Sequence, residues 1–350
     1  MRVAAIFPPG RRDRYWQPFH QANDAEWTIG LPASAAEADV ILIFGGDGTL
    51  HRYLADLVKL QVPVLVVPCG GGNDMARALG LHRRTDSLAA WRRFCGGGNN
   101  VRTIDLGLIQ PTQPPADGAP APAGQYFCTV GGVGLDAQTA RRANQLPSWL
   151  RRRGGYVISM LLSLAQLASV KMNLETERCE TEAVANHPKS AVLTAFANGP
   201  AYGGGMKIAP RAQLDDGKLD ICVVRDVSKF KLLCLFPTVF FGRHLSMAEV
   251  EYFQAERLQL ETEEPSDVYA DGEFVCRTPI EVSVAKRALQ VIVPVSVGAG
   301  VPARAGSAIG PSAGSGEDGR TRENARAYIQ NKRIALAWRT AGAFRSSSST

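Results

Sequence analysis

The sequence contains little cysteine, and its cysteines are not arranged in pairs. Seven of them are scattered over 350 residues, and no CxxC pair occurs. An odd number without close pairs fits neither a disulfide framework nor a zinc site. We therefore expect most of these cysteines to be small buried hydrophobic residues in a protein of the reducing cytoplasm.

A hydrophobic run long enough to cross a membrane is also missing. The longest apolar segment, residues 156–170, is interrupted by polar side chains and falls short of the roughly 20 residues that a span needs. At the N-terminus the apolar run 3–7 precedes the basic cluster RRDR (residues 11–14), which is the reverse of the order in a secretory signal peptide. We therefore expect a cytoplasmic protein that spans no membrane.

Strong charge of one sign is absent from most of the chain. The formal net charge is +6, but eight basic and three acidic residues lie in residues 300–350, which leaves +5 on this tail and +1 on the remainder. A nearly neutral folded part argues against nucleic acid as a partner, because a nucleic-acid-binding core presents a basic face. The Gly-, Ser- and Ala-rich tail, residues 295–350, is expected to be disordered, either solvated or in contact with an anionic membrane surface.

What the chain does contain first indicates a parallel α/β domain. Apolar runs at residues 3–7, 40–44 and 62–67 predict short buried strands. A helical segment, residues 50–60, separates the second run from the third, and an irregular stretch separates the first from the second. Strands that alternate with helices are typical of a parallel sheet.

A Pro-, Ala- and Gly-rich segment, residues 111–124, predicts a loop near a domain boundary, and strand-like runs dominate the sequence after it. The strands are expected at residues 126–130, 191–197, 219–224, 258–262, 281–284 and 289–293, with one long helix around 154–170. We therefore predict an α/β domain over residues 1–108, a β-rich domain over 109–294 and the tail over 295–350.

Glycine clusters follow two of the predicted N-terminal strands. They are "IFGGDGTLH" (residues 43–51) and "PCGGGNDMARALGL" (residues 68–81). Loops at the carboxyl ends of adjacent parallel strands face one crevice, where helix N-termini offer unpaired N–H groups to a phosphate. For either loop alone, a tight strand-to-helix turn is an equal alternative. Two loops in equivalent positions favour a phosphate site.

The polar residues of these loops allow more than one interpretation. Asp47 has no basic neighbour in its motif, so it suits magnesium, a ribose or a water network, with capping of the helix at Thr49 as the alternative. Asn73 and Asp74 are equally compatible with helix caps. We interpret His51 as a helix-surface residue rather than a catalyst, since the five histidines show no metal-ligand spacing.

Together with three later blocks, the two loops resemble the diacylglycerol kinase catalytic-domain family, which includes bacterial soluble lipid kinases and the sphingosine and ceramide kinases. The later blocks are "GVGLDAQTARRANQ" (132–145), "FANGPAYGGGMKIAPRAQLDDGKLDI" (196–221) and "YADGEFVCRTPIEVSVAKRALQVIVP" (269–294). The motif GGDGT alone also occurs in NAD kinases, whereas the ordered set with GGGND and the late DGE is specific. The resemblance covers about residues 40–294.

The resemblance implies a nucleotide-binding α/β domain with a parallel sheet, a C-terminal β-sandwich domain and a site in the cleft between them. It implies transfer of the terminal phosphoryl group of ATP, with Mg²⁺, to diacylglycerol or a similar lipid alcohol at the membrane surface. An NAD kinase-like phosphotransferase and a non-catalytic nucleotide- or lipid-binding protein stay as alternatives. A homodimer is also left open.

Peripheral contact with the inner face of the membrane is expected from two apolar runs that lie beside basic residues. They are residues 148–167 and 232–242. Packing of both runs in the protein core is the alternative.

Roles for individual residues also follow from the resemblance. The nucleotide would be lined by Gly45, Gly46, Asp47, Gly48, Thr49, Gly70, Gly71, Gly72 and Asn73. Asp271 and Glu273 would be the acid/base carboxylates, with Glu273 the first choice as proton acceptor. Their spacing leaves open whether a strand puts both on one face or Gly272 turns them apart.

A structural magnesium is implied at the turn LDDG. It would be held by Asp216 and the backbone carbonyls of Gln213 and Lys218. Taken without the resemblance, the same turn is an ordinary Asp-Gly hairpin.

Overall fold

The computed structural model describes residues 1–8, 12–22, 24–113, 123–146, 159, 162–163, 169–177 and 187–294. The predicted tail and most of the Pro-rich loop lie outside these residues, and so does most of the helix predicted around 154–170. Of that helix, residues 159, 162 and 163 are helical, whereas a strand has begun at residue 170. No helix in the described part of the chain combines the length and the apolar character that a membrane span requires.

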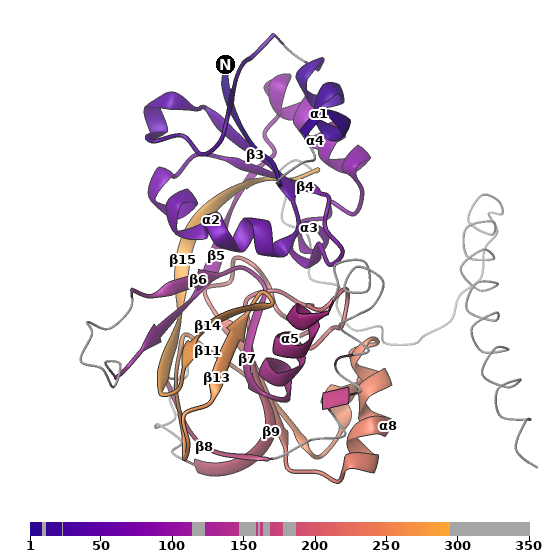
Figure 1. The fold of residues 1–350 in the computed structure, drawn as a ribbon, viewed down its shortest axis with the longest axis vertical. Helices are drawn as coiled ribbons and strands as arrows, with labels where there is room; N and C mark the ends of the chain where they lie inside the picture. Colours follow the sequence, from indigo (N-terminus) through magenta and orange to yellow (C-terminus); the bar gives the residue numbers. More distant parts are fainter. Residues whose placement is uncertain are drawn as a thin grey trace, which may run out of the picture. The chain divides into compact units, whose positions relative to one another are not determined.

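The N-terminal half contains a parallel sheet with the strand order β2-β1-β3-β4 (Figure 1). Its strands are β1 (Arg2–Ile6), β2 (Glu26–Ile29), β3 (Val40–Gly45) and β4 (Val64–Pro68). Every residue of β3 and β4 is buried, which explains why both read as continuous apolar runs. The predicted parallel α/β arrangement is confirmed.

The stretch between β1 and β3 is more regular than expected. It contains α1 (Arg12–His20), the strand β2 and the short 3₁₀ helix η1 (Ala35–Glu37). The sequence pattern of α1 and β2 is weak. The helix α1 contains Pro18, and β2 is an edge strand whose residues are mostly exposed, so it lacks an apolar run. Tertiary packing stabilises the region, since Phe19 is buried and its carbonyl accepts a hydrogen bond from the Trp91 indole (3.0 Å).

Three helices follow the motif strands. They are α2 (Asp47–Leu60), α3 (Asp74–Ala78) and α4 (Arg84–Cys95). The helix α2 buries Leu50, Leu54 and Leu57, a spacing that puts one apolar stripe on the sheet. Its end is a left-handed Gln61, whose N–H donates to the carbonyl of Leu57. The predicted helix over residues 50–60 is confirmed and begins three residues earlier.

The C-terminal half is β-rich, in the order β14-β13-β7-β9-β8-β12-β15, with β10 between β9 and β11. The helices for which the structure describes both ends are α5 (Leu135–Gln145), α8 (Lys229–Val239) and the short η3 (Arg243–Ser246). The strands are β6 (Gln125–Phe127), β7 (Val130–Gly134), β8 (Val170–Glu177), β9 (His187–Ala197), β10 (Leu219–Arg225), β11 (Val250–Ala255), β12 (Arg257–Thr262), β13 (Asp267–Ala270) and β14 (Glu273–Arg277).

The strand predicted over residues 126–130 is not continuous, because it is interrupted at residues 128–129, between β6 and β7. The backbone N–H groups of Cys128 and Thr129 donate to the carboxylate of Asp271 (2.8 Å each) instead of to a neighbouring strand. This interruption places Asp271 of the DGE motif next to the end of β6 and the start of β7.

A long antiparallel ribbon joins the two halves. The strands β5 (Val101–Pro111) and β15 (Ile280–Ile292) pair over nearly their whole lengths. The start of β15 also pairs with β12 and its end with β4 (Figure 1). A bulge between Ala285 and Leu289 explains why the sequence predicted two strands here. The domain boundaries stay a prediction, and β5 runs through the one after residue 108.

Candidate active site

The two glycine loops lie at the ends of the neighbouring strands β3 and β4 and pack against each other through bare backbone. A Cβ atom added at Gly70 would lie 2.7 Å from the Cα atom of Gly46, closer than real Cβ atoms come. The N–H of Cys69 also donates to the carbonyl of Gly45 (2.9 Å). This close approach requires glycine. The expected meeting of the two loops at one edge of the sheet is confirmed.

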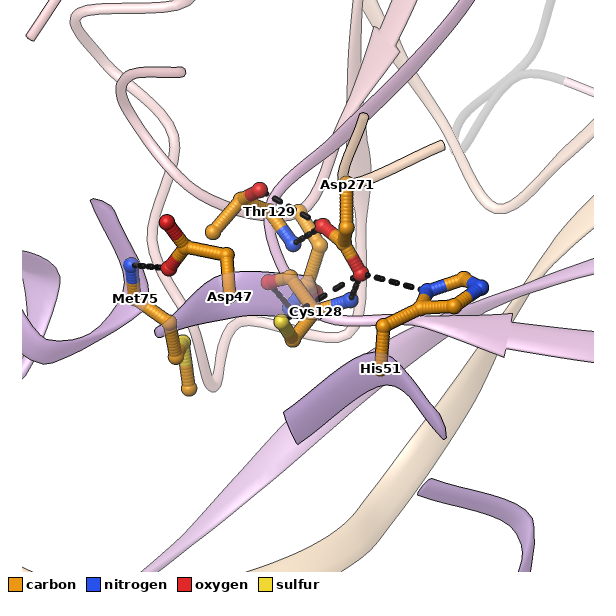
Figure 2. A network of polar contacts seen from close by, with 7 residues as sticks. Asp47, His51, Met75, Cys128, Thr129 and Asp271 are labelled. Carbon is orange, nitrogen blue, oxygen red and sulfur yellow. Dashed lines mark hydrogen bonds and ion pairs between the residues drawn. The ribbon is translucent and has the colours of Figure 1, made fainter. Parts of the chain in front are cut away.

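The side chain of Asp47 ties the two loops together. Asp47 is the first residue of α2, yet its carboxylate accepts hydrogen bonds from two backbone N–H groups at the start of α3. The donors are Asp74 (3.0 Å) and Met75 (3.0 Å), and Figure 2 shows the contact with Met75. Asp47 therefore caps a helix, but that helix is α3 and not its own helix at Thr49.

Asp47 is also electrostatically perturbed. Burial and, after it, the carboxylate of Asp74 raise the pKa of Asp47 to about 6, although the two N–H donors act in the opposite direction. A carboxylate with this pKa changes charge just below neutral pH. It is therefore suited to hold a cation or to take up a proton.

Asn73 shapes the second loop from within. Its backbone is left-handed (φ 54°), its Oδ1 accepts from the N–H of Gly70 (2.9 Å), and its Nδ2 donates to the carbonyl of the same residue (2.8 Å). The amide is engaged at both ends, so this side chain holds the curve of the loop. Its predicted contact with a nucleotide stays a prediction.

A third glycine loop, residues 203–205, contacts the second glycine loop by a hydrogen bond to Asp74. The buried carboxylate of Asp74 accepts from the N–H of Gly204 (2.8 Å) and forms an ion pair with Arg77 (2.7 Å). The sequence offered only a helix cap as the interpretation of Asp74. The contact with a loop 130 residues away could not be read from local spacing.

The carboxylate of Asp271 is buried and saturated with donors (Figure 2). Oδ1 accepts from the N–H (2.8 Å) and the hydroxyl (2.6 Å) of Thr129. Oδ2 accepts from the N–H of Cys128 (2.8 Å), lies 3.1 Å from Nδ1 of His51 and receives the Cys128 thiol (3.4 Å). A carboxylate with this many donors is held in one orientation.

His51 is the functional candidate that sequence reasoning missed. We expected a helix-surface residue, but only 11% of its side chain is exposed and it forms an ion pair with Asp271. Its position at the first turn of α2, four residues after Asp47, was the available signal, because residues at i and i+4 share one helix face. The ionic partner comes from a strand end 220 residues away.

The two partners shift each other's ionisation. Burial lowers the pKa of His51, but the hydrogen bond and charge of Asp271, with the charge of Glu273, outweigh it and leave the pKa above 6.5. Burial raises the pKa of Asp271, but His51, Thr129 and Cys128 outweigh it and leave the pKa below 3.8. Around neutral pH Asp271 is therefore a carboxylate anion.

Glu273 points to a different place from Asp271. Asp271 (φ 51°) and Gly272 (φ 86°) are both left-handed, so the chain turns between the two carboxylates and does not present them on one strand face. Glu273 is exposed, and its Oε1 would lie only 2.8 Å from a Cβ atom added at Gly48. The missing side chain at Gly48 thus makes room for the Glu273 carboxylate beside the first glycine loop.

These groups line one cleft of about 540 Å³. Its walls come from the two glycine loops with Thr49 and Arg52, from the DGE turn with Thr129, from α5 and from the third glycine loop. The lining includes Gly46, Asp47, Gly48, Gly70, Gly71, Gly72, Asp74, Ala140, Ala143, Asn144, Tyr202, Gly203, Gly204, Phe240, Tyr269, Asp271 and Glu273. Glycine-rich backbone and the exposed Glu273 carboxylate therefore share a cleft with apolar side chains.

The LDDG turn lies apart from the residues that line this cleft. Oδ1 of Asp216 accepts from the N–H of Lys218 (3.1 Å), and Asp215 pairs with Arg102 (2.6 Å). Burial, reinforced by Asp105, raises the pKa of Asp216. In the described part of the chain no three acidic, His or Cys side chains form a metal cluster. A partly buried carboxylate of this kind fits a hard cation that takes its other oxygen ligands from backbone carbonyls.

Comparison with known proteins agrees with this geometry. The family model "Diacylglycerol kinase catalytic domain" matches residues 18–109, and "YegS C-terminal NAD kinase beta sandwich-like domain" matches residues 129–293. A diacylglycerol kinase of Mycobacterium tuberculosis is 36% identical over 274 residues, which are 78% of this chain and 82% of the relative. The chain belongs to the diacylglycerol kinase catalytic-domain family.

Other relatives align over a comparable share of this chain at lower sequence identity. A diacylglycerol kinase of Bacillus subtilis is 27% identical over an alignment that includes 75% of this chain and 80% of the relative. The crystal structure of a diacylglycerol kinase from Bacillus anthracis superposes with a TM-score of 0.57 at 18% identity, covering 83% of this chain and 96% of that one. The likeness to that structure concerns the fold, an α/β domain followed by a β-sandwich-like domain.

Proposed function

We propose that this lipid kinase family member transfers the γ-phosphoryl group of ATP to the hydroxyl of diacylglycerol or a similar long-chain lipid alcohol. The observation that carries the proposal is the cleft in which two packed glycine loops lie beside the Glu273 carboxylate. Phosphoryl transfer needs positioning and charge neutralisation more than covalent help, and a backbone cradle with one base supplies both.

The glycine loops bind the phosphate chain of the nucleotide. Gly46, Gly48, Gly71 and Gly72 line the cleft at the starts of α2 and α3, where backbone N–H groups and helix dipoles favour negative charge. Gly70 also lines the cleft, and its N–H donates to the side chain of Asn73. Gly45 has a supporting role, since a Cβ atom there would lie 2.5 Å from Cβ of Thr49. Asn73 and Asp47 hold the loops in this shape.

Glu273 accepts the proton of the lipid hydroxyl as the phosphoryl group arrives. Its carboxylate is exposed beside Gly48, whereas the two oxygens of Asp271 are occupied by Thr129, Cys128 and His51. Asp271 is therefore a positioning residue that fixes the turn carrying Glu273. General-base assistance of this kind typically contributes about 100-fold to 10,000-fold in rate.

Two magnesium sites are part of the proposed function. When bound with ATP, Mg²⁺ neutralises phosphate charge. Asp47, with its pKa raised to about 6 by burial, is the carboxylate of the loops best suited to face it. A structural Mg²⁺ would be held at the LDDG turn by Asp216 and the backbone carbonyls of Gln213 and Lys218, which relieves the charge that this turn shares with Asp105.

Phosphorylation of NAD is the second candidate, favoured by one observation. Burial raises the pKa of Asp47 to about 6, so Asp47 could itself act as proton acceptor for a ribose hydroxyl.

Radiolabelled ATP incubated with the full chain and separate pools of diacylglycerol, sphingoid base and NAD tests the proposal. We expect label in the phosphorylated lipid only, and loss of labelling when EDTA removes Mg²⁺. Label only in NADP would show the second candidate to be right. Label in no product, with ATP still bound, would identify a non-catalytic nucleotide-binding protein.

A further inference from the structure

The helix α8 is apolar on two opposite sides. One side packs on the protein, where Leu232 and Val239 are buried and Phe236 and Phe240 lie against the same core. A helix that buries one apolar stripe normally presents polar side chains on the other. Packing in the core, the alternative interpretation of the 232–242 run, thus accounts for only one side of α8.

The opposite side is an exposed apolar stripe, which consists of Phe230, Leu233, Cys234, Pro237 and Phe241. Phe230, Leu233 or Cys234, and Pro237 follow each other at intervals of three or four residues, so they share one face of α8. Phe241 follows two residues after the end of this helix. Phe230 is 77% exposed, Phe241 75% and Leu233 48%. Large aromatic residues gathered in water on one helix face mark an interaction surface.

The stripe ends next to a residue of the candidate active site. Val239 is buried in the core, Phe240 lines the cleft, and Phe241 is the last member of the stripe. Whatever the stripe contacts is therefore brought next to the cleft wall. Ala140, Ala143 and Tyr269 line the same cleft and give it the apolar surface that an acyl chain needs.

The charges around the stripe indicate what kind of surface binds to it. Residues 228–246 contain Lys229, Lys231 and Arg243 and no acidic residue. Lys231 forms an ion pair with Glu249, and Arg243 is exposed just beyond the stripe. Apolar side chains flanked by basic ones match the boundary between acyl chains and anionic headgroups.

We propose that the apolar stripe of α8 docks this protein on an anionic lipid bilayer, so that Phe240 and the cleft wall face the lipid acceptor. The inference rests on the proposed function for the identity of the acceptor. A lipid alcohol keeps its chains in the bilayer, and a kinase that takes it from there works at the interface.

The double variant Phe230→Ser/Phe241→Ser of the full chain tests the docking surface. Co-sedimentation measures binding to vesicles of phosphatidylcholine with and without phosphatidylglycerol. We expect at least about tenfold weaker partitioning of the double variant, because interfacial binding scales with the apolar area buried. The matched control is Ile29→Ser on the edge strand β2, since Ile29 is 49% exposed and lies outside the stripe. The control should bind like the parent.

Charge is tested with Arg243→Gln. Its binding should fall about fivefold on vesicles that contain phosphatidylglycerol, should be unchanged on phosphatidylcholine alone, and should approach the parent as salt rises. Equal loss on both vesicle types would contradict the electrostatic part of the proposal.

The turnover readout separates docking from the proposed function. The double variant should lose phosphorylation of diacylglycerol in vesicles but keep it on detergent-dispersed diacylglycerol. If the parent phosphorylates no lipid while the stripe still controls vesicle binding, docking stands and the acceptor is wrong. Unchanged vesicle binding of the double variant overturns the proposal. If sedimentation then shows that the variant turns a dimer into a monomer, the stripe is an interface between two copies.

Discussion

At Gly46, Gly48 and Gly70 to Gly72 the cleft is shaped by backbone that carries no side chains, whereas at the DGE turn it is shaped by side chains and their hydrogen-bond donors. A Cβ atom added at Gly46 or at Gly70 would lie only 3.0 or 2.7 Å from the Cα atom of the other glycine, and Gly48 makes room for Glu273. Asp271 is fixed by contacts with His51, Cys128 and Thr129 from two other segments. The loops are thus most sensitive to an added atom, and the turn to a removed charge.

Removing the charge of the free carboxylate should have the largest effect. Glu273→Gln keeps the shape of the side chain but cannot accept the proton of a lipid hydroxyl. We expect lipid turnover to fall by about 100-fold or more at saturating lipid, with ATP binding retained. Steady-state kinetics and equilibrium ATP binding measure the two quantities.

The control for this change is Glu264→Gln, an exposed glutamate outside the cleft lining, which should leave turnover unchanged. Asp271→Asn should instead disturb the turn, because it puts an amide among five donors. Should Glu273→Gln and Asp271→Asn each keep more than about a tenth of the parental turnover, neither carboxylate is the base, and Asp47 becomes the candidate.

Adding one atom to the loops should have an intermediate effect. In Gly70→Ala the new Cβ atom would meet the Cα of Gly46 at 2.7 Å and Oδ1 of Asn73 at 3.0 Å, so the two loops must separate. We expect KM for ATP to rise about tenfold and the free energy of unfolding to fall by about 1–3 kcal/mol, the usual cost of overpacking.

Gly96→Ala is the matched control for the loop variant, because its added Cβ atom meets only ordinary contacts at 3.4 Å or more. It should leave KM for ATP unchanged. An unchanged KM in Gly70→Ala as well would show that the approach of the two loops does not shape the nucleotide site.

Weakening the support of the turn should have the smallest effect, and one that depends on pH. The pKa of His51 is raised by Asp271 against the opposing effect of burial, so its stabilising charge is fully present below 6.5 and is lost as pH rises through the raised value. The pKa of Asp271 is lowered by its donors despite burial, so its contribution is lost only in acid, below 3.8.

His51→Gln should therefore reduce the free energy of unfolding by about 1–2 kcal/mol near pH 5.5 and by less near pH 9. Urea unfolding at both pH values measures the difference. His82→Gln, at an exposed histidine, is the control and should show no such dependence. Equal destabilisation at the two pH values would show that His51 acts by packing alone.

The sequence predicted the elements whose local pattern is strong. The strands β3 and β4 are continuous apolar runs, and α2 carries its leucines at helical spacing, so both appeared within a few residues of their observed bounds. It failed at α1, at β2 and at the break between β6 and β7. Those elements depend on Phe19 packing near Trp91 and on Asp271 taking two N–H groups, and neither contact leaves a local signature.

The same division runs through the candidate site. Local sequence by itself determined that two glycine loops end neighbouring strands, because backbone freedom and close approach require a residue without a side chain. Only the tertiary structure decided that Asp47 caps α3, that His51 faces Asp271, and that Glu273 lies beside Gly48. The partners in the last two contacts are more than 200 residues apart in the chain. Which of two carboxylates in one turn is buried and which is free depends on these distant donors, and no spacing rule encodes them.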